Sequence, residues 1–159
     1  MIKMERLREI VAALGYESVK TYVNSGNVVF DTKKTADKKL ASAIHDAIKK
    51  EFGMDISVMV RSIDEIKEII ANNPYDGQFE NHKYLHVFFL DDELSPVHRE
   101  LLLANNSDTE MITLDGRTIY YLLRISIIDS VLGKGFIDKK LKVASTARNW
   151  RTVNKVAEM

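Results

Sequence analysis

The last quarter of the chain carries polar and basic residues whose types could together hold an anion. We expect Thr146 to be the N-cap of a final helix, because threonine is favoured at that position. The first N–H groups of a helix attract negative charge, and Arg148 can present two parallel donors to a phosphate or carboxylate. Asn149 can add a directional hydrogen bond, and Lys142 and Lys134 can add positive charge. These residues predict a binding site for a small phosphate- or carboxylate-bearing ligand.

A purely structural interpretation of the same residues stays open. In that interpretation Thr146 only caps the helix, Trp150 only packs against the core, and Arg148 pairs with a carboxylate of its own chain, as many arginines do. The two interpretations differ in whether Arg148 faces a ligand or a neighbouring acid.

Charge is distributed unevenly along the chain, although 23 basic and 23 acidic residues cancel overall. Residues 73–115 are acidic and residues 134–155 are basic. The basic stretch could contact a nucleic acid backbone. The alternative is a solvated face that complements the acidic stretch within the same molecule.

Two glycine-containing turns resemble catalytic or phosphate-binding motifs only in part. Gly133-Lys134-Gly135 lacks the length and the Lys-Ser/Thr ending of a nucleotide loop, so a helix-ending turn is the better interpretation. Asn24-Ser25-Gly26-Asn27 could present a serine nucleophile, but no base can be assigned to it, and these residue types are typical of a hairpin turn. Catalytic residues therefore stay unassigned.

We predict no metal site and no cofactor. His82 and His86 lie four residues apart but span a loop and a strand, and no third ligand has a recognisable spacing. Asp91-Asp92-Glu93 could attract a divalent cation, but a polar loop explains it equally well.

Composition narrows the class of protein. The chain has 159 residues, 45% of them hydrophobic, and no cysteine, which excludes disulfides, thiolate catalysis and cysteine-ligated metals. No apolar segment approaches the roughly 20 residues of a membrane span, and no signal sequence is recognised at the N-terminus. We expect a cytoplasmic protein without membrane contact.

Hydrophobic periodicity predicts an α+β fold in two halves, residues 1–74 and 75–159. The first half reads helix, hairpin (18–31), helix (36–52), strand (56–60) and helix (from Ser62). The second reads strand (84–90), helix (from Ser95), hairpin turning at Asp115-Gly116, short helix (127–132), short strand (141–143) and final helix. We interpret the two halves as duplicated ferredoxin-like, split βαβ units with antiparallel or mixed sheets and helices on one face. Tyr120 and Tyr121 point to opposite faces of one strand, so at most one should face the core.

Three segments resemble the bacterial family called domain of unknown function 1697. They are Met4–Arg8 leading to Leu14-Gly15-Tyr16, then Val19–Phe30, and finally Thr146–Val153 with its Thr-x-Arg-Asn-Trp pattern. The resemblance implies the duplicated α+β fold and no established activity. It also implies an opening strand and glycine-rich turn before the first helix, which this chain lacks. Truncation, or a strand supplied by another chain, would each account for that difference.

Two further functions stay open beside anion binding. An enzyme could have its active site at the seam between the halves, lined by Ser25, Asn27 and Arg148. Alternatively, the protein could be a structural or interaction protein that forms a homodimer by pairing sheet edges.

Overall fold

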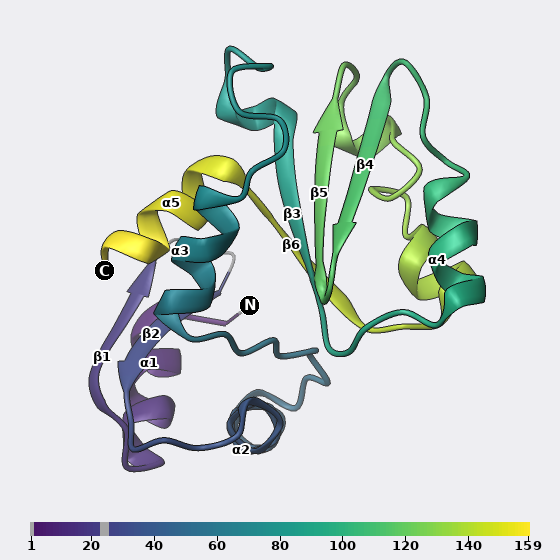
Figure 1. Cartoon of the computed structure of the whole chain (residues 1–159). Coiled ribbons are helices and arrows are strands. Elements are labelled where there is room, and N and C mark those ends of the chain that lie inside the picture. Colours follow the sequence, from purple (N-terminus) through teal and green to yellow (C-terminus); the bar gives the residue numbers. More distant parts are fainter. Residues whose placement is uncertain (1, 23–25) are drawn as a thin grey trace. The chain divides into compact units, whose positions relative to one another are not determined.

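The computed structural model describes residues 2–22 and 26–159, which form two compact units. The first unit extends to Ile63 and includes Val156–Met159, and the second comprises Asp64–Lys155. Figure 1 labels their helices and strands. The chain passes from the first unit to the second at the start of the third helix, and the predicted domain boundary at residue 74 stays a prediction.

The first unit contains two helices and a two-stranded antiparallel sheet. The helices are α1 (Met4–Ala13) and α2 (Asp37–Phe52), and the strands are β1 (Glu17–Tyr22) and β2 (Asn27–Asp31). Gly53, at φ 67°, ends α2 in the left-handed conformation that glycine adopts without strain. The predicted helices and hairpin are thus confirmed, while part of the predicted turn, residues 24–25, lies outside the described residues.

The core of the first unit comes mainly from its helices. Its buried members are Leu7, Ile10, Val11, Ile44 and Ile48. Apolar residues of the strands and of the segment after α2 contact this core but are only partly buried.

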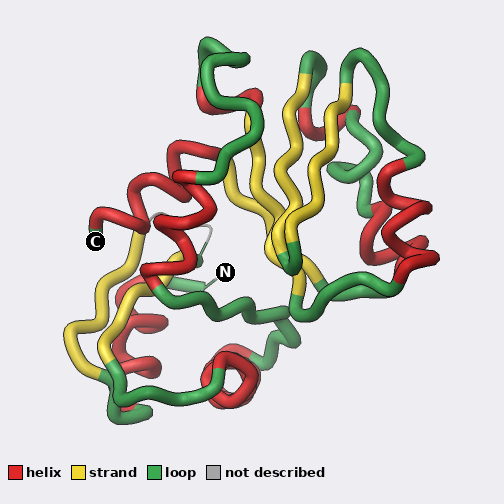
Figure 2. Tube along the Cα trace, viewed as in Figure 1, coloured by secondary structure: helices red, strands yellow, loops and turns green. Residues whose placement is uncertain are grey.

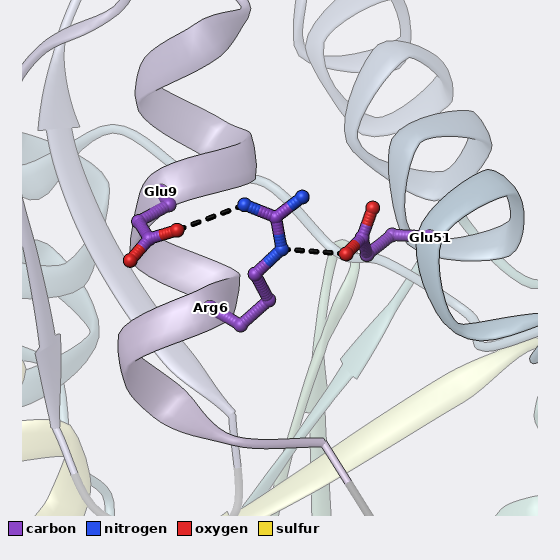
Figure 3. A network of polar contacts seen from close by, with 3 residues as sticks. All are labelled: Arg6, Glu9 and Glu51. Carbon is purple, nitrogen blue, oxygen red and sulfur yellow. Dashed lines mark hydrogen bonds and ion pairs between the residues drawn. The ribbon is translucent and has the colours of Figure 1, made fainter.

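An arginine on the surface joins the two helices of this unit (Figure 3). Arg6 of α1 donates from Nε to Glu51 of α2 at 2.5 Å and from Nη1 to Glu9 at 2.8 Å. These hydrogen bonds raise the pKa of Arg6 and lower the pKa of Glu51. The three side chains are solvent-exposed to a third or more, so salt screens the network.

The second unit contains a four-stranded antiparallel sheet in the order β4-β5-β3-β6. The strands are β3 (Leu85–Leu90), β4 (Glu110–Asp115), β5 (Thr118–Leu123) and β6 (Ser145–Asn149). Its α-helices are α4 (Pro96–Leu103), all of α3 (Ile63–Ala71) except Ile63, and α5 (Trp150–Glu158) as far as Lys155. Short helical turns at 82–84, 127–129 and 137–141 complete the elements. The predicted turn at Asp115-Gly116 is confirmed, with Gly116 at φ 59°.

Both faces of this sheet are covered within the unit. On one face, Phe88, Tyr121 and Leu102 of α4 share a cluster with Ile137 and Leu141 of the turn at 137–141. On the other, the Tyr120 hydroxyl donates to the Ile69 carbonyl of α3 at 2.7 Å. Tyr120 and Tyr121 are therefore 1% and 0% exposed, and the expectation that at most one would face the core was wrong.

Three local predictions are corrected by the structure. Residues 56–60 are not a strand, although their apolar residues alternate (Figure 2). Residues 141–143 are not a strand either, because Leu141 ends the helical turn at 137–141 and Lys142 adopts φ 54°. Thr146 does not begin the last helix, since it lies in the middle of β6.

The α+β class is thus confirmed, with antiparallel sheets in both units. The duplication of a ferredoxin-like unit stays a prediction. None of the described helices is long and apolar enough to cross a membrane.

Candidate functional site

Arg148 and Thr146 lie on the same face of β6, at an edge of the second unit's sheet. Hydrogen bonding to β3 sets the register, which pairs Arg148 with Val87 and Thr146 with Phe89. Ala147, between them, packs against the cluster that includes Phe88. Because side chains alternate along a strand, Thr146 and Arg148 point to the opposite face.

The guanidinium of Arg148 is held in one orientation by its own strand. Its Nη1 donates to Thr146 Oγ1 at 2.7 Å and to the Ala147 carbonyl at 2.8 Å. The residue is partly buried, and this burial lowers its pKa. Arginine nevertheless keeps its charge at neutral pH, so the site holds a positioned and partly dehydrated cation. Such a group can present donors to a carboxylate or phosphate.

The capping role predicted for Thr146 belongs instead to Asn149. Asn149 Oδ1 accepts from the Thr152 N–H at 3.0 Å, and α5 starts at Trp150. Thr146 cannot cap because residues 145–149 form a ladder with β3, which is about 60 residues earlier in the chain. Asn149 therefore fixes the start of α5, and Thr146 accepts a hydrogen bond from Arg148.

The two predicted lysines lie on the other face of the sheet from Arg148. Lys142 follows Leu141, and Lys134 lies between Leu132 and Ile137, all three of which belong to the cluster on the Tyr121 face. Both lysine side chains are exposed, and the Lys134 carbonyl accepts from Lys139 Nζ at 3.0 Å. The structure thus brings together Arg148 and Thr146, but does not bring the lysines to them.

His86 is a partly buried polar residue of β3 that lies on the sheet face opposite to Arg148. It pairs with Asn149 in the β3–β6 register, and burial lowers its pKa, so its ring is neutral at neutral pH. In the described part of the chain, its Nδ1 is buried and makes no hydrogen bond. Strand alternation in the sequence could have shown that His86 shares a sheet face with Tyr121. Its pairing with Asn149 could not be predicted, because β6 was not predicted as a strand.

An aromatic pair lies at the start of α5. The rings of Phe79 and Trp150 meet edge to face, with centroids 6.4 Å apart. Trp150 therefore packs against another aromatic ring, as expected. This packing is compatible with both the anion-binding and the purely structural interpretation of the segment.

The other motifs have structural roles or lie outside the described residues. Asn27 Nδ2 donates to the Tyr22 carbonyl at 2.9 Å across the hairpin. Ser25 is not among the described residues, so an active site between the halves stays a prediction. Across residues 2–22 and 26–159, no group of three or more His, Asp or Glu residues could hold a metal ion.

Comparison with known proteins identifies relatives of this chain. The family model described as "Protein of unknown function (DUF1697)" matches residues 1–120. The solved structure of conserved bacterial protein SP0830 from Streptococcus pneumoniae is similar, with a TM-score of 0.72 and 20% sequence identity. The similarity covers 99% of this chain and 88% of that one, and at this identity it shows the fold alone. No curated protein matches the chain.

Proposed function

Because this chain belongs to the DUF1697 family, a family of unknown function, we propose its function from its own geometry: it binds a small anionic ligand through Arg148. The ligand bears a phosphate or carboxylate group, because these are the anions that a guanidinium recognises with two parallel hydrogen bonds.

The orientation of Arg148 carries the proposal. A surface arginine loses side-chain entropy when it binds a ligand, whereas the Thr146 hydroxyl and the Ala147 carbonyl already restrain this guanidinium. Its partial burial strengthens a charge-assisted hydrogen bond, since less water competes for the donors.

The N-terminus of α5 adds a second favourable feature. It follows Arg148 by two residues, and the first N–H groups of a helix carry partial positive charge. Asn149 already accepts the N–H of Thr152, so it positions this end of the helix. Arg148 and Thr146 are the residues of the proposed site, and Asn149 supports it.

The test is a thermal-shift screen with inorganic phosphate, citrate, nucleoside monophosphates and a short RNA. A ligand at about 100 times its Kd should add about 2.7 kcal/mol of stability to the wild-type protein. Arg148→Ala should abolish this gain and Arg148→Lys should weaken it, because lysine lacks the planar fork. Arg151→Ala is the matched control, since Arg151 is exposed on α5 and should leave the gain intact.

Thr146→Val separates positioning from charge. The variant keeps Arg148 but removes the hydroxyl that accepts from Nη1. We expect a weaker ligand response with little loss of stability in the free protein. A ligand response that survives Arg148→Ala would contradict the proposal.

A nucleic acid is the alternative ligand that the exposed lysines at 134, 139, 140 and 142 favour. These lysines lie apart from Arg148, on the Tyr121 side of the sheet. RNA binding should therefore weaken steeply with added salt, and it should persist in the Arg148→Ala variant. Binding of a small anion should be lost in that variant.

We also propose that the second unit is ferredoxin-like. Its order β4-β5-β3-β6, with antiparallel neighbours throughout, supports this plan, as do α4 and the turn at 137–141, which pack on one face. The first unit would be its counterpart.

A further inference from the structure

Among the described strands, β4 is an outer strand of the second unit's sheet and pairs with β5 (Figure 1). In an antiparallel pair, alternate residues turn their backbone N–H and C=O groups toward the partner, and the residues between them turn these groups outward. The Leu90 N–H donates to the Arg117 carbonyl, so odd-numbered residues of β5 bond to β3 and even-numbered ones bond to β4. The register of β4 with β5 therefore gives the outward position to Glu110, Ile112 and Leu114.

The loop that follows α4 supplies partners for the outward groups of Ile112. Asn106 Oδ1 accepts from the Ile112 N–H at 2.6 Å, and Asn106 Nδ2 donates to the Ile112 carbonyl at 3.3 Å. A residue of an added antiparallel strand would make the same pair of bonds, one accepted and one donated. The carboxamide of Asn106 thus occupies the place of one residue of a neighbouring strand.

Ser107 bonds to Glu110 in the same manner, two residues earlier along β4. Its Oγ accepts from the Glu110 N–H at 3.1 Å, and its own N–H donates to the Glu110 carbonyl at 2.8 Å. Of the outward-facing residues of β4, both Glu110 and Ile112 are therefore bonded to the loop that precedes the strand.

Without that loop, the edge would suit pairing with a second copy of β4. A two-fold axis at Ile112 would place Ile112 opposite its copy and Glu110 opposite Leu114, so the outward donors and acceptors would meet one another. The strand reads Glu-Met-Ile-Thr-Leu-Asp, and its four central residues are uncharged. Isoleucine and threonine favour strands, and an uncharged edge of this kind promotes pairing between chains.

We propose that Asn106 is an edge-blocking residue, which prevents β4 from pairing with β4 of a second copy of this chain. Water can also satisfy the groups of Ile112, but an incoming strand displaces water readily. The carboxamide is tethered, and its Nδ2 also donates to the Leu103 carbonyl at the end of α4, at 3.1 Å. An incoming strand would have to break these bonds and move the loop. The outer edge of β4 is thereby closed to homodimerisation by strand pairing.

Hydrogen exchange and sedimentation velocity of the full chain test the proposal with the variant Asn106→Ala. In the wild type, the Ile112 amide should be protected at every protein concentration, although it lies on an edge of the sheet. In dilute Asn106→Ala, this amide should exchange at least about tenfold faster. At high micromolar concentration, the variant should sediment as a dimer and its Ile112 amide should regain protection, because β4 then pairs with its copy.

Two further variants separate the open edge from a general loss of stability. Asn105→Ala is the matched control, because Asn105 lies in the same loop but its Nδ2 donates to the Leu101 and Leu102 carbonyls of α4. This variant should be destabilised without forming a dimer. Asn106→Asp keeps an acceptor for the Ile112 N–H and adds a charge at the edge, so it should stay monomeric.

Four results would overturn the proposal. An Ile112 amide that exchanges freely in the wild type would show that Asn106 does not close the edge. An Asn106→Ala protein that is folded and stays monomeric would show that the carboxamide only fastens the loop. Equal association of Asn105→Ala would attribute the dimer to lost stability. Association of Asn106→Ala without renewed protection of the Ile112 amide would place the contact on another surface.

Discussion

The hydroxyl of Tyr120 donates a hydrogen bond to the backbone carbonyl of Ile69, 2.7 Å away, and so joins β5 to α3. Both groups lie on the sheet face opposite to α4. Burial raises the pKa of Tyr120 to about 12, so the hydroxyl remains a donor throughout the neutral range. This bond connects the sheet to the helix that covers its second face.

Tyr120→Phe should therefore destabilise the second unit. The substitution keeps the ring but leaves the Ile69 carbonyl without this donor, which costs about 1–2 kcal/mol. Chemical denaturation followed by the fluorescence of Trp150 measures the loss. Tyr84→Phe is the control, because Tyr84 is 37% exposed and its substitution should change stability by less than about 0.5 kcal/mol. Equal effects of the two variants would contradict this prediction.

Elements with strong local signals could be predicted from the sequence. The hairpin β4–β5 follows from Asp115-Gly116 between two apolar runs, and Gly53 marks the end of α2. Ser95 caps α4 as predicted, accepting from the His98 N–H at 3.2 Å. These features depend on residues close to one another in the chain.

Features that depend on distant partners could not be predicted. Residues 145–149 form a strand because β3 offers them a hydrogen-bonding edge, although Thr146 has a good residue type for a helix cap. Residues 56–60 alternate as a strand should, yet no described strand pairs with them. Of the candidate site, Arg148 was predicted as its centre, but its contact with Thr146 follows from the strand geometry of β6.

Glu110 should be important for the stability of the second unit although it is an acidic residue in a largely apolar setting. It is 9% exposed, and it accepts from the Tyr121 hydroxyl and from the Val131 N–H, the latter at 2.7 Å. Glu110→Ala removes this acceptor from the buried Tyr121 hydroxyl and from the partly buried Val131 N–H, and should cost about 2–3 kcal/mol. Glu110→Gln keeps a carbonyl oxygen at this position and should cost less.

The same denaturation experiment distinguishes these outcomes. Glu93→Ala is a suitable control, because Glu93 is exposed in the loop before α4. If Glu110→Ala and Glu93→Ala had similar unfolding midpoints, the buried acceptor would not contribute as the structure indicates.

His45 should make the stability of the first unit depend on pH. Its Nε2 lies 2.6 Å from Asp55 Oδ1 and its Nδ1 lies 3.0 Å from Asp46 Oδ1. The hydrogen bonds to Asp55 and then Asp46 raise the pKa of His45 above its ordinary 6.5, and the bond to His45 lowers the pKa of Asp55 below 3.8. The nearby charge of Lys49 also lowers the pKa of Asp55.

The sign of the effect follows from these two shifts. The contribution of His45 is complete below pH 6.5 and is lost as the pH rises through its raised pKa in the folded protein. The contribution of Asp55 is complete above pH 3.8 and is lost as the pH falls through its lowered pKa. The pair should thus stabilise the unit most between about pH 4 and 6.5.

Urea midpoints of wild type and His45→Gln at pH 5.5 and pH 8.5 test this. The difference between the two proteins should be larger at pH 5.5, and it should shrink with added salt because the side chains are partly or largely exposed. Asp55→Asn should show the same pH dependence as His45→Gln. A difference that grows from pH 5.5 to pH 8.5 would show that the pair does not act as an ion pair.

Gly133 should not tolerate a side chain. A Cβ atom there would lie 1.7 Å from the Ile127 carbonyl oxygen and 2.7 Å from Ser130 Oγ, and the Gly133 N–H donates to that same hydroxyl at 3.0 Å. Gly133→Ala must therefore displace the backbone of the turn at 127–129, at a cost of about 3 kcal/mol or more. Gly77→Ala is the comparison, because Gly77 has open space around it but φ of +76°, so alanine there should cost about 1–2 kcal/mol. Unfolding free energies of the two variants check the order. If Gly133→Ala were as stable as Gly77→Ala, the backbone of the turn at 127–129 could shift at little cost. Close packing would then not explain the glycine at position 133.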